Sequence, residues 1–239
     1  MFSKNFYKRI NYQIHKKAPF TIFFHFFLDR LKHPLVKNKK KKLKKKHQNF
    51  LQSKKTTTDY FSINAYYWDL IIKRNFKDFS YLEIGSWEGN SALYILNNFI
   101  TKRVVCVDIW DLYKDIYKEE HFERFLNFKY NLDQFNKRFS FFKSTSDKFF
   151  DNNSEKFDII YIDGAHEACQ VYKDISNAWK ILNVKGIIIC DDYFYGDISC
   201  NLDNNLPAYS INKFLSQNKK KIKIICVNNN QIFFKKIFD

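Results

Sequence analysis

Glycine is scarce in this sequence, with five residues in 239. Four of the five fall at expected junctions between strands and helices: Gly85, Gly89, Gly164 and Gly186. The first two form a Gly-x-x-x-Gly turn between an apolar strand and a helix, where a ligand can approach the backbone and the free N–H groups of the helix start. Residue 87 is Trp where a dinucleotide-binding fingerprint has its second glycine. This argues against a nicotinamide oxidoreductase, the second enzyme class that such a sheet accommodates.

Paired cysteines and long apolar runs are also missing. The five cysteines show neither a C-x-x-C motif nor an even disulfide framework, so we expect a reducing, cytoplasmic setting. The longest apolar run near the N-terminus, Ala18 to Leu28, is interrupted by His25 and is about half of the ~20 residues that a membrane-spanning helix needs. It also lacks a small-residue cleavage site, which argues against a secretory signal.

Acidic residues are nearly absent from the first 58 positions. This N-terminal tail (residues 1–58) holds 17 Lys and Arg against one acid, Asp29, whereas residues 59–239 hold 24 basic and 24 acidic residues. The surplus of positive charge therefore describes the tail alone. We expect two parts, the basic tail and a neutral domain over residues 59–239.

Within the tail, the spacing of Phe20, Phe24, Phe27 and Leu31 predicts a short amphipathic helix that Pro34 ends. Eight lysines in ten residues follow over 37–46, and their mutual repulsion favours an extended linker. Three interpretations stay open: a solvated disordered linker, peripheral contact with an anionic membrane, or contact with RNA.

From residue 59 onwards, strand-like and helical runs alternate, which predicts a parallel sheet covered on both faces. Only Asn228, Asn229 and Asn230 separate the last two strands, so these form a hairpin and the final strand is antiparallel to its neighbour. The expected strands are Ser80–Ile84, Arg103–Val107, Phe139–Lys143, Phe157–Ile162, Gly186–Cys190, Ile222–Val227 and Gln231–Ile237, and the expected helices are 59–74, 89–99, 119–135, 167–182 and 207–217.

These elements resemble the class I S-adenosylmethionine-dependent methyltransferases. The resemblance rests on E-I-G-S-W-E-G-N-S from Glu83, on V-V-C-V-D ending at Asp108, and on D-G-A-H from Asp163 and D-D-Y from Asp191. The last two motifs are similar to a branch of small bacterial methyltransferases of the methyltransferase domain 24 type. The resemblance implies an α/β, Rossmann-like, doubly wound seven-stranded sheet, mostly parallel with an antiparallel C-terminal hairpin strand.

The resemblance also implies the residues that would hold S-adenosylmethionine. They are Glu83, Gly85, Ser86, Trp87, Gly89, Asn90, Ser91, Asp108, Ile109, Trp110, Ser144, Thr145 and Asp163. Physical reasoning supports Glu83 and Asp108 independently. Both lie at the carboxyl ends of neighbouring strands, and a carboxylate there can accept hydrogen bonds from both ribose hydroxyls. Alternatives are a helix cap or surface pair for the acids, a helix cap for Ser144 and Thr145, and a core cover for Trp110.

Two devices could deprotonate a hydroxyl acceptor. His166 would act as a general base beside Asp192, with Asp163 as a further catalytic group. Alternatively, Asp163, Asp191 and Asp192 would gather a hard cation such as Mg²⁺. The simpler alternative is that Asp191 and Asp192 are one cap and one solvated acid, and that His166 braces the following helix.

The leading hypothesis is methylation of an oxygen atom on a small molecule or glycan precursor. Alternatives are a non-catalytic binding module tethered to membrane or RNA by the tail, and an RNA methyltransferase that uses the tail to hold its substrate. We expect the acceptor pocket to include the loops Trp110–Glu120 and Tyr193–Asn205. We expect a cytoplasmic protein, with peripheral membrane attachment as the alternative. The acceptor, the metal dependence and the oligomeric state are not determined by the sequence.

Overall fold

A computed structural model of the chain describes residues 4–110, 120–135, 137–196, 205–228 and 230–238. The chain divides into two compact units. The central unit is His33–Asn153, and the terminal unit combines Met1–Lys32 with Ser154–Asp239. The predicted boundary between residues 58 and 59 stays a prediction.

The strands form a seven-stranded sheet in the order β3-β2-β1-β4-β5-β7-β6. The last strand, β7, is antiparallel to both β5 and β6, as the short hairpin predicted. The α/β, mostly parallel fold expected from the sequence is therefore confirmed. The strands are β1 (Asp78–Ile84), β2 (Ile100–Asp108), β3 (Phe139–Lys143), β4 (Phe157–Ile162), β5 (Leu182–Cys190), β6 (Ile222–Val227) and β7 (Ile232–Lys236).

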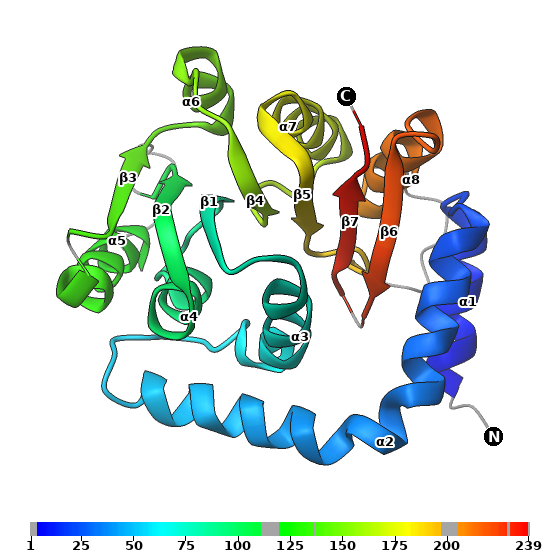
Figure 1. Cartoon of the computed structure of the whole chain (residues 1–239), viewed down its shortest axis with the longest axis horizontal. Helices are drawn as coiled ribbons and strands as arrows, with labels where there is room; N and C mark the ends of the chain where they lie inside the picture. Colours follow the sequence, from blue (N-terminus) through cyan, green and yellow to red (C-terminus); the bar gives the residue numbers. More distant parts are fainter. Residues whose placement is uncertain (1–3, 111–119, 136, 197–204, 229, 239) are drawn as a thin grey trace. The chain divides into compact units, whose positions relative to one another are not determined.

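The central unit is built on the parallel strands β1, β2 and β3. Six of the seven residues of β1 are buried. This agrees with its mainly apolar sequence, which is typical of a strand covered on both faces. Helices α4 and α6 lie on opposite faces of β2 (Figure 1). The helical segments are η1 (Ser62–Asn64), α3 (Ala65–Asn75), α4 (Asn90–Asn98), α5 (Glu120–Leu132), η2 (Asp133–Phe135) and α6 (Ser146–Asn152).

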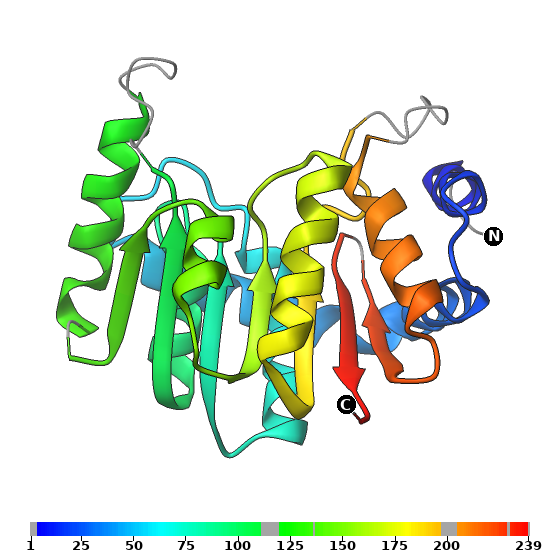
Figure 2. The same cartoon turned by 90° about the horizontal axis from the view of Figure 1, so that it is seen from above.

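The terminal unit is built on β4, β5, β7 and β6. Helices α7 (Ala168–Ile181) and α8 (Pro207–Gln217) pack against each other over these strands (Figure 2). Pro207 stands in the first turn of α8, where its missing N–H costs nothing and its fixed φ suits the helix. The buried side chains of Ile188, Phe233 and Phe234 form the middle of this core.

The N-terminal region is helical, which corrects two expectations. Helix α2 runs from Phe20 to Leu51, so Pro34 lies inside it and does not end it, and the lysine run 37–46 is helical and not extended. Lysine is a good helix former, and the buried side chains of His47 and Leu51 fix the end of this helix in the central unit. Sequence reasoning also missed α1 (Lys4–His15). Among the described residues, no helix combines the length and apolar character needed to cross a membrane.

Candidate active site

The turn after β1 has the backbone geometry that its glycines predicted. Gly85 and Gly89 have φ of 86° and 83°, in the left-handed region that glycine adopts without strain. A Cβ atom on Gly89 would come within 2.3 Å of Leu132 Cδ1, so a larger residue would have to displace the Leu132 side chain. Gly89 also precedes the first residue of α4, and the N–H groups of that first turn are available to polar atoms of a ligand.

Glu83 and Asp108 lie near the carboxyl ends of the neighbouring strands β1 and β2. The buried Glu83 accepts a hydrogen bond of 2.5 Å from the Tyr81 hydroxyl, and burial raises its pKa to about 7. Asp108 accepts backbone N–H bonds of 2.8 Å from Trp87 and from Trp110. Burial raises the pKa of Asp108, and these backbone donors oppose that rise. The juxtaposition expected from the sequence is present.

The third strand of the central unit brings two further predicted residues to this edge. Asp108 pairs with Lys143, and the backbone N–H of Ser144 bonds Asp108 O at 3.0 Å. Thr145 is the N-cap of α6, with its hydroxyl accepting from Lys148 N at 3.3 Å, so the capping alternative holds for this residue. The buried Ser144 Oγ has no hydrogen-bond partner among the described residues. A carboxylate beside an unused hydroxyl fits the ribose and base of an adenosine group.

The two tryptophans of this region have different environments. The Trp110 ring is buried 4.6 Å from the Phe128 ring and 5.0 Å from the Phe125 ring, and its Nε1–H donates to Trp87 O at 2.7 Å. Trp110 therefore packs over the hydrophobic core, as one of the alternatives predicted. Trp87 is 38% exposed, with the Arg124 guanidinium 3.5 Å above its ring. Trp87 therefore presents a charged, stacked surface at the turn.

Glu88 has a role that the sequence did not reveal. Its carboxylate is fully buried and accepts from Thr57 N at 2.7 Å and from Asn127 Nδ2 at 2.8 Å. Asn131 exchanges two 2.8 Å bonds with the backbone of Lys55. Asn90 was expected at the cofactor, and its side chain donates to Thr58 O at 3.2 Å. These contacts fasten the end of the predicted tail to the turn.

The remaining predicted cofactor residues lie in the same part of the central unit. Ser86 and Ser91 are buried in the turn and in the first turn of α4, and Ile109 follows β2 and is half-buried. Asp163 is the exception, because it follows β4 in the terminal unit.

In the terminal unit, the side chains of His166 and Asp192 are in contact. Nε2 of His166 lies 2.8 Å from Asp192 Oδ2, and the ring of Tyr195 stacks on the imidazole at 3.9 Å. His166 remains 40% exposed. The hydrogen bond that His166 donates to Asp192 raises the pKa of His166 above its ordinary value of 6.5, and partial burial opposes this. The predicted base and its predicted neighbour are therefore in contact.

Asp191 is held by a set of donors that the sequence did not suggest. Its carboxylate accepts from Tyr161 OH at 2.5 Å, Gln231 Nε2 at 2.7 Å and Asn230 Nδ2 at 3.1 Å. Asn230 also donates to Asp192 Oδ1 at 2.9 Å. The only signal in the sequence was the cluster of amides at the hairpin, which we interpreted as turn chemistry alone.

The expected three-carboxylate metal site does not appear as a group. The Tyr161 hydroxyl lies between two of these acids, 2.8 Å from Asp163 Oδ2 and 2.5 Å from Asp191 Oδ2, and both Asp191 oxygens have protein donors within hydrogen-bond distance. Among the described residues, no three His, Cys, Asp or Glu side chains are arranged to hold a metal ion. The metal site stays a prediction. Most of the two expected acceptor loops, residues 111–119 and 197–204, lies outside the described residues.

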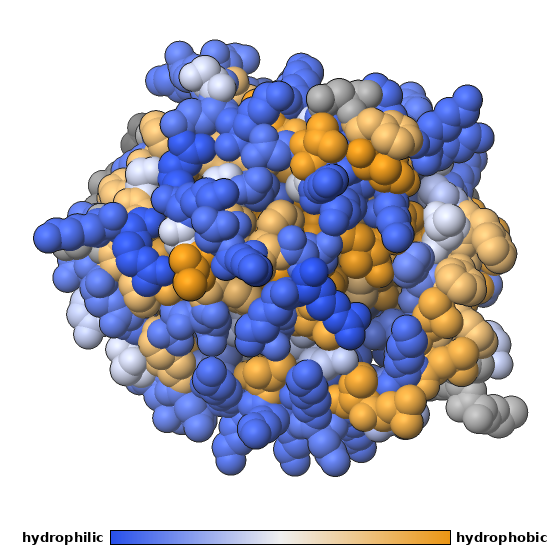
Figure 3. Space-filling model, in the orientation of Figure 1, coloured by the Kyte–Doolittle hydropathy of each residue, from blue (hydrophilic) through white to orange (hydrophobic). Residues whose placement is uncertain are grey.

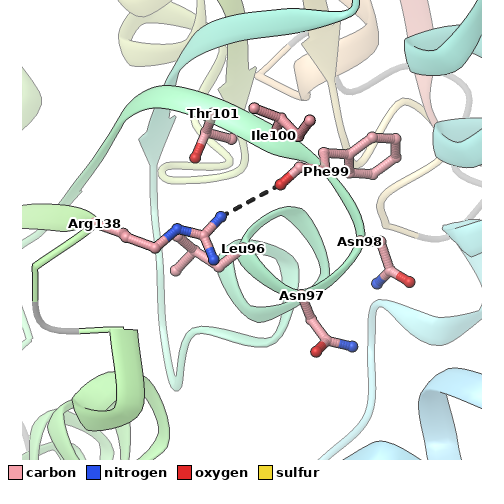
Figure 4. Close-up of a pocket in the computed structure, with 7 residues that line it drawn as sticks. All are labelled: Leu96, Asn97, Asn98, Phe99, Ile100, Thr101 and Arg138. Atoms are coloured by element: carbon pink, nitrogen blue, oxygen red, sulfur yellow. Dashed lines mark hydrogen bonds between the residues drawn. The ribbon is translucent and has the colours of Figure 1, made fainter.

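A hollow of about 530 Å³ lies at the other end of β2 (Figure 4). Arg138 reaches across it to donate to Phe99 O at 3.3 Å. It contains none of the predicted site residues, which stand at the carboxyl ends of the strands, where α/β sheets bind ligands. The lining residues are Leu96, Asn97, Asn98, Phe99, Ile100, Thr101 and Arg138.

Comparison with known proteins shows what this chain is similar to. Residues 82–193 match the model of a methyltransferase domain. An uncharacterized protein of Acanthamoeba polyphaga mimivirus is 29% identical over 120 residues, which are 48% of this chain and 52% of that protein. The chain thus spans about half the length of this relative.

Two solved structures share the fold. The O-methyltransferase from Bacillus cereus, in complex with S-adenosylhomocysteine, superposes with a TM-score of 0.54 at 15% identity, over 90% of this chain and 99% of that one. An rRNA methylase from Streptococcus thermophilus gives a TM-score of 0.53 at 8% identity, over 77% and 100% of the two chains. Residues 82–193 therefore resemble a methyltransferase domain, and the chain shares the fold of these solved methyltransferases.

Proposed function

We propose that the protein methylates a hydroxyl oxygen of a small molecule or glycan precursor. The observation that carries this proposal is the contact between His166 and Asp192, 2.8 Å apart at the carboxyl ends of β4 and β5. A hydroxyl acceptor must lose its proton during methyl transfer, and a histidine paired with a carboxylate is suited to take it at neutral pH.

The residues of this chain have separate tasks in the proposed reaction. When bound, S-adenosylmethionine supplies an electrophilic methyl group for in-line displacement. Asp108 accepts hydrogen bonds from the ribose hydroxyls, and the turn at Gly85 and Gly89 leaves room for the rest of the cofactor.

In the acceptor half, Asp192 holds Nε2–H of His166 and so leaves Nδ1 to take the acceptor proton. The positive charge that develops on the ring is then balanced by the Asp192 carboxylate. Asn230 and Gln231 hold the adjacent Asp191, which keeps the segment after β5 in place. The donors already bound to Asp191 support this metal-free route over one that uses Mg²⁺.

Two linked measurements test the proposal. Calorimetric titration of S-adenosylhomocysteine should give micromolar binding to the full chain. Asp108→Ala should weaken it at least about tenfold, because a bidentate ribose contact is worth about 1.5–3 kcal/mol. Asp78→Ala, at the exposed start of β1, is the matched control and should bind normally.

Methyl transfer is then followed by mass spectrometry with phenols, sugar derivatives and RNA as acceptors, with and without a chelator. A product methylated on a hydroxyl group that forms in the presence of the chelator supports the proposal. Methylation of RNA alone, or a strict requirement for added Mg²⁺, contradicts it. Absence of cofactor binding in a folded protein would remove the cofactor assignment as well.

A further inference from the structure

Helix α2 presents an apolar row on its outer face. Phe20, Phe24, Phe27 and Leu31 follow one another at spacings of four, three and four residues, which places them along one side of the helix. Phe20 is 80% exposed, and Phe24 and Leu31 are each 51% exposed. Apolar side chains gather on the surface at the right of Figure 3, where Figure 1 draws α1 and the start of α2.

The opposite face of the same helix is firmly packed. Ile22 and Phe26 are fully buried. The Phe26 ring stacks 5.7 Å from Phe6 of α1 and lies 5.7 Å from Phe194, which follows β5. The inner face of α2 therefore packs against the core, and the outer row is a second apolar surface on the same helix.

Hydrogen bonds and ring contacts hold this helical hairpin, α1 with the start of α2, in the terminal unit. Asn212 of α8 donates to Lys16 O at 2.9 Å and accepts from Tyr193 OH at 3.0 Å. Tyr12 lies 5.6 Å from the Phe194 ring, and the Arg9 guanidinium is 4.8 Å above that ring. The apolar row is thus presented by an ordered support.

Positive charge surrounds the row. Residues 1–32 contain seven Lys and Arg and one acid, Asp29. Lys4, Lys8, Lys17 and Lys32 are exposed on the hairpin, and α2 continues directly into the run of eight lysines over 37–46. An apolar row with a cationic surround matches the chemistry of an anionic bilayer surface, where rings enter the headgroup boundary and lysines contact lipid phosphates.

Two other partners match this surface less well. Single-stranded RNA is bound by aromatic platforms interleaved with polar groups that track its backbone, whereas this row mixes phenylalanine with leucine and has no polar residue within it. A second copy of the chain would bring the lysine-rich surrounds of two molecules together, which like-charge repulsion opposes.

We propose that the outer row of α2, formed by Phe20, Phe24, Phe27 and Leu31, binds the surface of an anionic membrane. The helix lies in the plane of the interface, and its lysines contact the headgroups. This inference concerns a surface distinct from the methyl-transfer residues and does not depend on the acceptor.

Co-sedimentation of the full-length protein with vesicles tests the proposal. Vesicles of equimolar phosphatidylcholine and phosphatidylserine should retain the protein, and vesicles of phosphatidylcholine alone should retain much less. The variant Phe20→Gln/Phe24→Gln/Leu31→Gln should bind at least about tenfold more weakly, because three exposed apolar side chains lose their insertion into the bilayer. These residues are exposed, so the variant should keep the far-ultraviolet circular dichroism of the parent.

The matched control is Ile100→Gln/Phe238→Gln, which removes two exposed apolar side chains elsewhere and should bind as the parent does. A second variant, Lys41→Gln/Lys42→Gln/Lys45→Gln, should lose binding to anionic vesicles by about fivefold or more and retain less salt dependence. Equal retention by both vesicle types, or parental binding by the Phe20 variant, overturns the proposal. Self-association on a sizing column or RNA binding without vesicle binding overturns it as well.

Discussion

At the scale of single residues, the protonation of His166 depends chiefly on one neighbour. The hydrogen bond that His166 donates to Asp192 raises the pKa of His166 above 6.5. A general base works only in its neutral form, so methyl transfer should rise with pH through an inflection above 6.5. In Asp192→Asn the inflection should move to lower pH, and the maximal rate should fall because the imidazolium loses its counter-charge.

The pH profile of kcat/KM, compared between the parent and Asp192→Asn, measures this effect. Glu167→Gln is the control, because that carboxylate also raises the pKa of His166 but by less than Asp192 does. An unchanged inflection in Asp192→Asn, with cofactor binding intact, would remove His166 from the role of base. His166→Gln should abolish the pH-dependent limb altogether.

Backbone strain also collects at the predicted site residues. Trp87, Trp110 and Asp192 have positive φ values of 49°, 40° and 55°, which side chains other than glycine rarely adopt. In each case a carboxylate binds the backbone N–H. Asp108 accepts from both tryptophans, and Asp191 accepts from Asp192 at 2.8 Å. Asp108 and Asp191 therefore stabilise these turns.

At the scale of elements, Glu88 joins the segment after α2 to the turn after β1. Replacement by Gln places an amide donor against the donors of Thr57 and Asn127. The buried bonds of a charged acceptor are lost, so Glu88→Gln should lower the free energy of unfolding by about 2–3 kcal/mol. The segment around Lys54 and Lys55 should also be cleaved faster by trypsin.

Urea denaturation and limited proteolysis with mass mapping check this expectation. Glu123→Gln on the exposed side of α5 is the matched control and should change neither stability nor cleavage. If Glu88→Gln is digested at the parental rate, the contacts at Thr57 do not hold the segment.

At the scale of the whole molecule, two buried groups give opposite pH dependences to stability. Burial lowers the pKa of His47 from 6.5 to about 4. The unfolded chain therefore binds this proton first as pH falls, and stability is lost between pH 6.5 and about 4. Burial raises the pKa of Glu83 from 4.5 to about 7, so the folded state holds a proton that the unfolded state releases, and stability falls as pH rises through that window.

Removing one of these two groups should leave the pH dependence of stability that the other group causes. His47→Phe should leave a protein whose stability declines as pH rises from about 5 to 7, and Glu83→Gln should leave one whose stability increases from about pH 4 to 6.5. Urea denaturation at several pH values, followed by circular dichroism, measures both slopes. Parallel slopes in the two variants would show that other groups dominate.

Much of the sheet was predictable because its signals are local. Runs such as Phe157–Ile162 are apolar and separated by helical segments, and the short asparagine turn allows only an antiparallel partner. The predicted strands are confirmed with shifts of a few residues. The site was predictable only in part, because Tyr161, Asn230 and Gln231 approach Asp191 from elements far apart in sequence.

The sequence by itself determined the order of strands and helices, the glycine turn and the acids at the strand ends. Each of these depends on periodicity or on the conformation of a few adjacent residues. Only the tertiary structure decided that the lysine run is helical, because repulsion between its charges competes with the burial of His47 and Leu51 in the central unit. The partners of Glu88, Asp191 and His166 were likewise decided there, since hydrogen bonds between distant segments leave no local pattern.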